Sequence, residues 1–506
     1  MTLCFQLKRF RNFRSQLWMV STLTALAWIA AVSARATGDE RPDLVVVMCD
    51  DMGFSDLGCY GGEVPTPTLD RLAGEGLRFR GFYNNAKCEH TRASLLTGHW
   101  WPTVGASATV EYARPTFGER LREAGYQTFL AGKWHAGQTP HARGFDRAYG
   151  LVDGCCNHWN PGVARAGEPE PARKKVRRWA IDGHEMLPMT PRLKTFHSTD
   201  AFTDAAVGFV RGADVARPLL LYLAYTAPHY PLHASREDVE ARMGDYRVGW
   251  DVIRERRSER QKAIGVVGGS VRLGRRDESV PRWEAVADDV RERWVMRMAA
   301  YAAMIEHMDR RIGDVLAALE DAGREDVLVL FLSDNGACDE SIDRSTATGA
   351  MPWEVTSYLT QGRPWAMASN TPFERYKTDL AEGGIRTPLI AWRPGHVPAG
   401  GWTDAVGHVV DVTPTLMELA GLPADDSLPG RSLVATLKEP GFAPERTLFW
   451  QFRDQAACRV GDRKWIRTAE REVTFDLSAD PTEREALAVD EDLRRRWEDW
   501  WGEIGK

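Results

Sequence analysis

The stretch that decides the fold reads Asp43-Leu-Val-Val-Val-Met-Cys49 and is followed by the acid pair Asp50-Asp51. A short, near-continuous apolar run with three consecutive valines predicts a strand that is buried on both faces. Such strands are typical of parallel sheets covered by helices, so the run favours an α/β fold. In such folds sites form beyond the carboxyl ends of the strands, which is where the two acids lie.

Further apolar runs predict strands of the same sheet, and helical spacing appears between them. The strands are expected at residues 127–131, 218–224, 327–332 and 388–392, and the helices at 117–124, 201–210 and within 284–322. We therefore expect a large, mostly parallel sheet flanked by helices. Residues 157–195 and 235–283 show no clear periodicity and are expected to be irregular insertions near the mouth of the site.

A chain of 506 residues is too long for one small core, so a large domain plus a smaller one is expected. We assign residues 37–440 to a catalytic domain and 441–506 to a small C-terminal subdomain. In the latter, residues 447–452 and 474–477 predict an antiparallel sheet, and residues 491–501 predict a closing helix.

Residues 1–36 have the pattern of a signal peptide. Basic residues precede an apolar stretch at 17–32, and Ala34-Arg35-Ala36 fits a cleavage site. A membrane-spanning helix usually needs about 20 apolar residues, so the pattern favours cleavage over a membrane anchor. We expect a periplasmic or secreted protein without a stable membrane span.

Charge and cysteine content narrow the possible partners. The formal net charge is -6, and the basic residues at 173–178 are typical of a solvated loop, so no nucleic-acid partner is expected. Seven cysteines follow residue 36, and an odd number suggests that one of them has a distinct chemical role.

Polar clusters follow four of the predicted strands. They are Asp50-Asp51, Lys133 with His135, His229, and Asp334-Asn335. Oxygen ligands suit Ca²⁺ or Mg²⁺ better than zinc. Adjacent acids also occur in turns and helix caps, but their shared position at strand ends favours a metal site.

Cys88 is a candidate reactive thiol on chemical grounds alone. It precedes a predicted helix at residues 91–97, and a helix N-terminus lowers the pKa of a thiol and favours anions. Arg92 could lie near both Cys88 and a bound anion. The alternative is a small buried cysteine with a packing role.

Residues 84–98 read Asn-Asn-Ala-Lys-Cys-Glu-His-Thr-Arg-Ala-Ser-Leu-Leu-Thr-Gly and resemble the signature of the formylglycine-dependent sulfatases, in the alkaline phosphatase superfamily. Three further segments are similar to that family and follow its order. They are Gly-Lys-Trp-His at 132–135, Pro-His at 228–229, and the segment from Lys377 through Glu-Gly-Gly-Ile-Arg to Pro388. The resemblance implies the alkaline-phosphatase-like α/β fold.

The resemblance also implies a mechanism. A maturase would oxidise Cys88 to formylglycine, whose hydrate would attack the sulfur of a sulfate ester. The implied metal, most simply Ca²⁺ with Mg²⁺ as an alternative, would be held by Asp50, Asp51, Asp334, Asn335 and the modified Cys88. Lys133 and Lys377 would bind the sulfate, His135 would contact the formylglycine, and His229 would assist the leaving oxygen, with His229 also close to the substrate.

One position departs from the family pattern. His90 stands where the Cys-x-Pro-x-Arg signature has proline. The chain is therefore expected to be an arylsulfatase-like hydrolase of an aryl sulfate or a sulfated carbohydrate, with two alternatives. One is a phosphate or phosphonate ester hydrolase of the same superfamily. The other is a non-catalytic protein that binds sulfated glycans and leaves Cys88 unconverted.

Overall fold

The computed structural model describes residues 41–105, 112–170, 176–191 and 195–504, and the description below concerns the unit that begins at Pro42. The predicted signal peptide at 1–36 lies outside the described residues. Among the described helices, none is long and apolar enough to cross a membrane.

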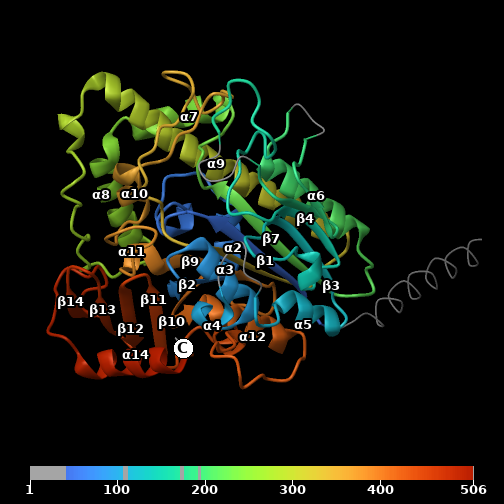
Figure 1. Cartoon of the computed structure of the whole chain (residues 1–506). Coiled ribbons are helices and arrows are strands. Elements are labelled where there is room, and N and C mark those ends of the chain that lie inside the picture. Colours follow the sequence, from blue (N-terminus) through green and yellow to red (C-terminus); the bar gives the residue numbers. More distant parts are fainter. Residues whose placement is uncertain (1–40, 106–111, 171–175, 192–194, 505–506) are drawn as a thin grey trace, which may run out of the picture. The chain divides into compact units, whose positions relative to one another are not determined.

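In the described part of the chain, ten strands form one large sheet in the order β10-β2-β9-β8-β1-β7-β3-β4-β5-β6 (Figure 1). Their bounds are β1 (Asp43–Asp50), β2 (Leu77–Tyr83), β3 (Gln127–Lys133), β4 (Arg147–Leu151), β5 (Trp179–Ile181), β6 (His184–Met186), β7 (Leu219–Pro228), β8 (Val327–Ser333), β9 (Arg386–Trp392) and β10 (Gly401–His408). Strands β8, β1, β7, β3 and β4 are mutually parallel, whereas β9 is antiparallel to its neighbours β8 and β2. The prediction of a large, mostly parallel sheet is confirmed.

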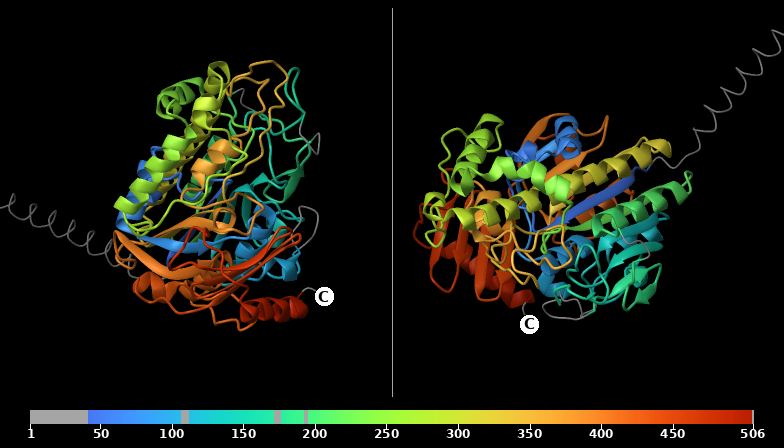
Figure 2. Two further views of the ribbon diagram at one scale, coloured as in Figure 1. Left: turned by 90° about the vertical axis from the view of Figure 1, so that its left-hand side faces the viewer. Right: turned by 90° about the horizontal axis from the view of Figure 1, so that it is seen from above.

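Helices cover both faces of this sheet (Figure 2). They are α2 (Pro67–Glu75), α3 (Cys88–Thr97), α4 (Trp101–Val104), α5 (Phe117–Glu123), α6 (Ser198–Gly212), α7 (Arg236–Tyr246), α8 (Gly249–Ala263), α9 (Asp288–Asp321), α10 (Arg363–Ser369), α11 (Glu382–Ile385), α12 (Val412–Leu419) and α13 (Val434–Lys438). Alternate residues of β1 divide between the two layers, because successive side chains of a strand point to opposite faces. Val45 and Val47 pack with α6 and α9, while Leu44 and Val46 pack with α5 and α12.

A second, small sheet lies at the C-terminal end of the sequence, drawn in red in Figure 1. It is antiparallel and consists of β11 (Thr447–Phe452), β12 (Gln455–Val460), β13 (Arg463–Arg467) and β14 (Glu472–Asp476). Helix α14 (Glu491–Ile504) packs on it through Trp497 and Trp500, in a cluster with Trp450 and Trp465 of the sheet. The predicted small sheet and closing helix are confirmed, and the domain boundary at 440 stays a prediction.

Two expectations about helices are wrong. Helix α3 begins at Cys88 rather than at residue 91, so Cys88 is its first residue. The segment 235–283 is not irregular throughout, because it contains α7 and α8. Helix α8 was missed because its buried face carries Arg254, Arg257 and Gln261 as well as apolar residues, which hides the helical spacing.

Candidate active site

The carboxyl ends of four neighbouring parallel strands bring the predicted site residues together. Asp50 ends β1 and pairs in register with Pro228 at the end of β7. His229 follows Pro228, and Asp334 with Asn335 follows the end of β8. Lys133 is the last residue of β3, on the other side of β7. The site therefore lies at one edge of the sheet, as in other open α/β folds.

The acids at this edge form a cluster of oxygen atoms with unused acceptor capacity. Asp50 Oδ1, Asp51 Oδ2 and Asn335 Oδ1 are buried and have no hydrogen-bond partner among the described residues. Asp50, Asp334 and Cys88 each offer one ligand atom, and these atoms lie within 4.8 Å of one another. Such a donor set, dominated by oxygen, fits a hard divalent cation such as Ca²⁺ or Mg²⁺. The residues present thus fit the metal that the sequence implied.

Two buried lysines flank the acid cluster. Lys133 Nζ lies 2.6 Å from Asp50 Oδ2, and Lys377 Nζ lies 2.5 Å from Asp51 Oδ1. Burial alone would lower the pKa of each lysine, but the negative charges around it, led by that of its aspartate, together outweigh burial and raise both pKa values. Both lysines are therefore cations that can attract an anion to this edge of the sheet.

Two residues beside the site have unusual backbone conformations. Gly132, just before Lys133, has φ +124°, and a Cβ there would collide with the carbonyl of Ala224 in β7. Asp51 itself has φ 65°, in the left-handed region that few residues other than glycine adopt. Such strain is held by the surrounding structure and is common at functional sites.

Cys88 and Arg92 are joined to the same cluster through α3. Cys88 is 3% exposed and is the first residue of the helix, where the helix dipole favours negative charge. Arg92, one turn further on, donates from Nη2 and Nε to Asp334 Oδ2 at 2.8 and 3.1 Å. It also donates to the Lys133 carbonyl at 2.9 Å. Arg92 thus ties α3 to the ends of β8 and β3.

His229 presents one ring nitrogen to the site. Its Nδ1 lies 2.6 Å from the Tyr230 carbonyl, which can only accept, so Nδ1 donates and Nε2 is left for the site. Nε2 lies 3.5 Å from Asp51 Oδ2. Burial lowers the pKa of His229 to about 4 despite the nearby charge of Asp51. His158 fixes the same loop, because its Nε2 donates to the His229 carbonyl at 3.0 Å.

His135 lies on the Cys88 side of the cluster. Its Nε2 is 3.4 Å from Glu89 Oε2, and Cys88, Glu89 and His135 form one compact group of possible ligands. Burial and the charge of Lys133 lower the pKa of His135. The sequence analysis missed Glu89, whose only signal was its position next to Cys88. All the predicted residues thus lie in one connected set of contacts.

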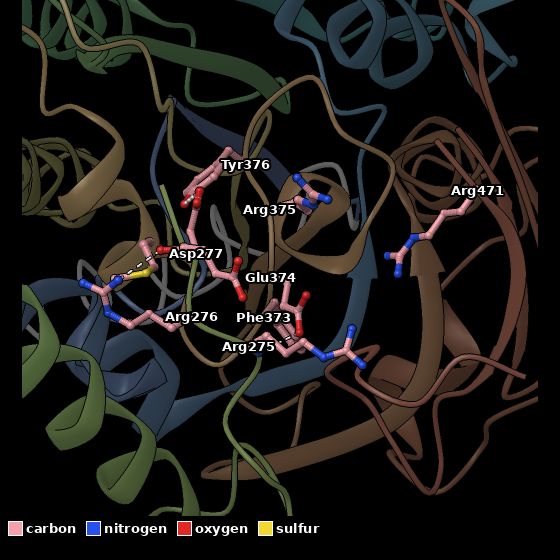
Figure 3. A pocket seen from close by; sticks show the side chains of 10 residues that line it. Arg275, Arg276, Asp277, Phe373, Glu374, Arg375, Tyr376 and Arg471 are labelled. Carbon is pink, nitrogen blue, oxygen red and sulfur yellow. Dashed lines mark hydrogen bonds between the residues drawn. The ribbon is translucent and has the colours of Figure 1, made fainter. Parts of the chain in front are cut away.

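A separate pocket, drawn in Figure 3, does not contain these residues. It is lined on one side by Tyr376, whose hydroxyl donates to Asp277 Oδ2 at 2.8 Å. The next residue, Lys377, reaches Asp51 instead. The segment that carries Lys377 therefore separates this pocket from the acid cluster.

Comparison with known proteins identifies the family. The sulfatase family profile matches residues 42–422. The chain is 32% identical over 443 residues to an arylsulfatase of Klebsiella aerogenes, covering 80% of this chain and 92% of that protein. It is 29% identical over 453 residues to the human N-acetylgalactosamine-6-sulfatase, covering 84% of this chain and 71% of that protein. The chain therefore belongs to the sulfatase family and is a sulfuric-ester hydrolase.

Solved structures agree on the fold. A crystal structure of Ps i-CgsB in complex with k-i-k-neocarrahexaose is similar with a TM-score of 0.65 and 24% identity, over 91% of this chain and 93% of that chain. The structure of BT4656 with D-glucosamine-2-N,6-O-disulfate is similar with a TM-score of 0.62 and 20% identity, over 92% of this chain and 98% of that chain. At these identities the similarity supports the fold alone.

Proposed function

We propose that this sulfatase hydrolyses a sulfate ester of a carbohydrate or an aryl alcohol, with a formylglycine made from Cys88 and a bound divalent cation, most simply Ca²⁺. The observation that carries the proposal is the position of Cys88. It begins α3, its ligand atom lies within 4.8 Å of those of Asp50 and Asp334, and two lysine cations flank the same acids. A carbohydrate substrate is supported by the relatives, which include N-acetylgalactosamine-6-sulfatases.

The acids would hold the cation through the free oxygens of Asp50, Asp51 and Asn335 together with Asp334. When bound, the cation would supply Lewis-acid polarisation, and the hydrate of the aldehyde at position 88 would supply the nucleophilic hydroxyl oxygen. The chain's other residues bind the substrate and move protons.

Each flanking residue has a role that its position supports. Lys133 and Lys377 bind the sulfate oxygens and stabilise their charge. His229 delivers a proton from Nε2 to the leaving oxygen. The negative charge of a bound sulfate would stabilise the protonated imidazole. His135, next to Glu89, is placed to accept a proton from the group at position 88.

Intact-peptide mass spectrometry of the Cys88 peptide, on protein made in its native host, tests the modification. We expect the aldehyde, and we expect Cys88→Ala to be inactive. A thiol at Cys88 in fully active protein would contradict the formylglycine mechanism. A thiol in inactive protein that still binds sulfated sugars would contradict the proposal and favour a non-catalytic binding protein.

A paired assay with an aryl sulfate and an aryl phosphate separates the two hydrolase classes. Lys133→Ala and Lys377→Ala should each lower kcat/KM for the sulfate on the order of 10²-fold or more, because each lysine faces a developing anion. Chelation, or Asp50→Ala or Asp334→Ala, should abolish activity, and added Ca²⁺ should restore only the chelated wild type. Activity that is insensitive to chelation and to these substitutions would remove the acids from the metal site.

The N-terminal pattern supports export as part of the proposal. We infer that residues 1–36 are removed and that the mature enzyme works in the periplasm or outside the cell. N-terminal sequencing of the native protein should find a start near residue 37, whereas an intact N-terminus in the membrane fraction would favour the anchor.

A further inference from the structure

Arg177 is a buried arginine without a carboxylate partner among the described residues. It is 8% exposed, its buried Nε has no hydrogen-bond partner among the described residues, and its Nη2 donates to Cys155 Sγ at 3.7 Å. Buried cations in proteins are nearly always paired. In the described part of the chain, no carboxylate therefore occupies these donors, and an anion could.

The sheet places Arg177 at the edge where the active site lies. Lys133 at the end of β3 pairs with Leu151 of β4, and Leu151 pairs with Trp179 of β5. Two strand spacings amount to about 10 Å between the backbones of Lys133 and Trp179. Strand β5 is antiparallel to β4, so Arg177, two residues before Trp179, lies beyond the carboxyl ends of β3 and β4.

The loop of residues 152–158 connects Arg177 to the proposed catalytic residues. Gly154 packs so closely on His135 that a Cβ there would lie 2.5 Å from the ring Nε2. Cys155, the next residue, contacts Arg177, and His158 donates to the His229 carbonyl. Burial raises the pKa of the Cys155 thiol, and the charges of Arg177 and then Lys133 oppose that rise. Arg177 is thus linked through Cys155 to the neighbourhood of Lys133 and His135.

We propose that the Arg177 guanidinium binds a second anionic group of the substrate, a sulfate ester or a carboxylate, beside the scissile sulfate. The inference rests on the proposed function and names its substrate class, a sulfated sugar with at least two anionic groups. A guanidinium binds oxyanions through two parallel hydrogen bonds, and burial strengthens such contacts. Lys133 and Lys377 hold the scissile sulfate, so a simple aryl sulfate has no group for Arg177.

The test compares Arg177→Gln with Arg178→Gln. Arg178 is a matched control because the adjacent guanidinium is already paired, with Nη2 2.7 Å from Glu185 Oε2. The substrates are 4-nitrophenyl sulfate, N-acetylgalactosamine 6-sulfate, its 4,6-disulfate, and a 6-sulfated disaccharide that carries a uronic acid. The last two distinguish a second sulfate from a carboxylate.

Wild type should prefer at least one of the two dianionic sugars to the monosulfated sugar by roughly tenfold or more in kcat/KM. Arg177→Gln should remove this preference, chiefly by raising KM for the dianionic sugars, and its kcat/KM for 4-nitrophenyl sulfate should stay within about twofold of wild type. Arg178→Gln should keep kcat/KM within about twofold of wild type on all the substrates. Absence of the preference in wild type would overturn the inference even if the variant failed to fold. So would an equal loss on every substrate in a folded variant.

Calorimetry on Cys88→Ala protein gives a second readout that needs no aldehyde. The dianionic sugars should bind on the order of tenfold more tightly than the monosulfated sugar, and Arg177→Gln should abolish the difference. If no sulfate ester is cleaved by wild type yet this binding difference is present, the proposed function fails while the anion site stands. Equal binding of all the sugars would overturn the anion site alone.

Discussion

At the scale of single residues, His90 shows how a departure from the family signature is accommodated in the folded structure. Its ring stacks on Trp101 with centroids 3.8 Å apart and planes at 3°, and it meets Phe452 in an edge-to-face pair with centroids 5.5 Å apart. Burial lowers the pKa of His90 to about 3, so the ring is neutral in this stack. His90 lies in the first turn of α3, and the expectation that residue 90 precedes the helix is wrong. Proline is tolerated in a first turn, where the backbone N–H has no partner within the helix.

His90→Pro, produced together with a converting enzyme that reads Cys-x-Pro-x-Arg, should raise the fraction of aldehyde at Cys88. Activity should rise in proportion, while activity per aldehyde stays nearly constant. Loss of the stack should cost about 1 kcal/mol and lower the melting temperature slightly. Mass spectrometry of the Cys88 peptide measures the aldehyde fraction, and an aryl sulfate assay measures the activity.

His90→Ala is the matched control for this substitution. It removes the same stack without adding the proline, so it should lower the melting temperature but leave the aldehyde fraction unchanged. Equal aldehyde fractions in the proline variant and in wild type would show that residue 90 does not limit maturation.

At the scale of elements, the sequence predicted strands where burial is uniform and missed them where it is not. Strands β1, β7 and β8 are apolar along nearly their whole length because both faces are buried. Strand β2 alternates Arg78 and Arg80 with apolar residues, and β10 includes polar residues and glycine, so neither stood out. Both were absent from the predicted sheet for that reason.

The residues of the candidate site could be predicted from the sequence, but some of their contacts could not. Its acids, lysines and histidines could be predicted because each directly follows a recognisable strand or motif. The hydrogen bonds of Arg92 to Asp334 could not, since they join residues far apart in the sequence through the packing of α3 against β8. The contact of Glu89 with His135 likewise depends on how α3 lies beside the end of β3.

Helix α2 depends on a cap from another helix. Its own first residues provide no side-chain cap, and Asp309 of α9 accepts the backbone N–H groups of Thr68 at 2.9 Å and Leu69 at 2.8 Å. Burial raises the pKa of Asp309 to about 6 in spite of these hydrogen bonds. The carboxyl group is thus more easily protonated in the folded than in the unfolded chain, where its pKa is about 4.

Asp309→Asn should therefore change the pH dependence of stability. A carboxyl with a raised pKa contributes stability that is fully present below about pH 4 and is lost as the pH rises through about 6. The asparagine does not titrate. The free energy of unfolding of wild type should fall relative to that of the variant by on the order of 2–3 kcal/mol between pH 4 and pH 7.

Denaturant unfolding of both proteins across this pH range measures the difference. Asp314→Asn, on the same helix but with a side chain 52% exposed, should show little change with pH relative to wild type. Parallel pH curves for wild type and Asp309→Asn would contradict the assignment of the titration to Asp309.

At the scale of the whole molecule, a buried ionic cluster joins the small sheet to the segment that carries the site. Glu382 begins α11, five residues after Lys377, and its carboxylate accepts from Tyr83 Oη of β2 at 2.8 Å. Lys464 of β13 lies between two carboxylates, with Nζ 2.8 Å from Glu382 Oε1 and 2.8 Å from Glu483 Oε1. One buried cluster of hydrogen-bonded side chains thus links the large sheet, the segment that carries Lys377 and the small sheet.

Lys464→Met should destabilise the protein strongly. Lys464 is 0% exposed, and its removal leaves Glu382 and Glu483 buried near each other without the cation between them. Breaking a buried ion pair from one side costs about 3–5 kcal/mol, and the nearby Arg386, 3.2 Å from Glu382, favours the lower end of that range.

Arg463→Met is the control on the same strand and should cost less than about 1 kcal/mol. Arg463 is 44% exposed, and its ion pair with Asp490 is long, at 3.6 Å. Urea unfolding measures both variants, and limited proteolysis should detect earlier cleavage in the small sheet of Lys464→Met alone. Equal unfolding midpoints for the two variants would mean that the cluster does not hold the small sheet to the rest of the molecule, and that the packing of Trp450, Trp465 and Trp497 does so instead.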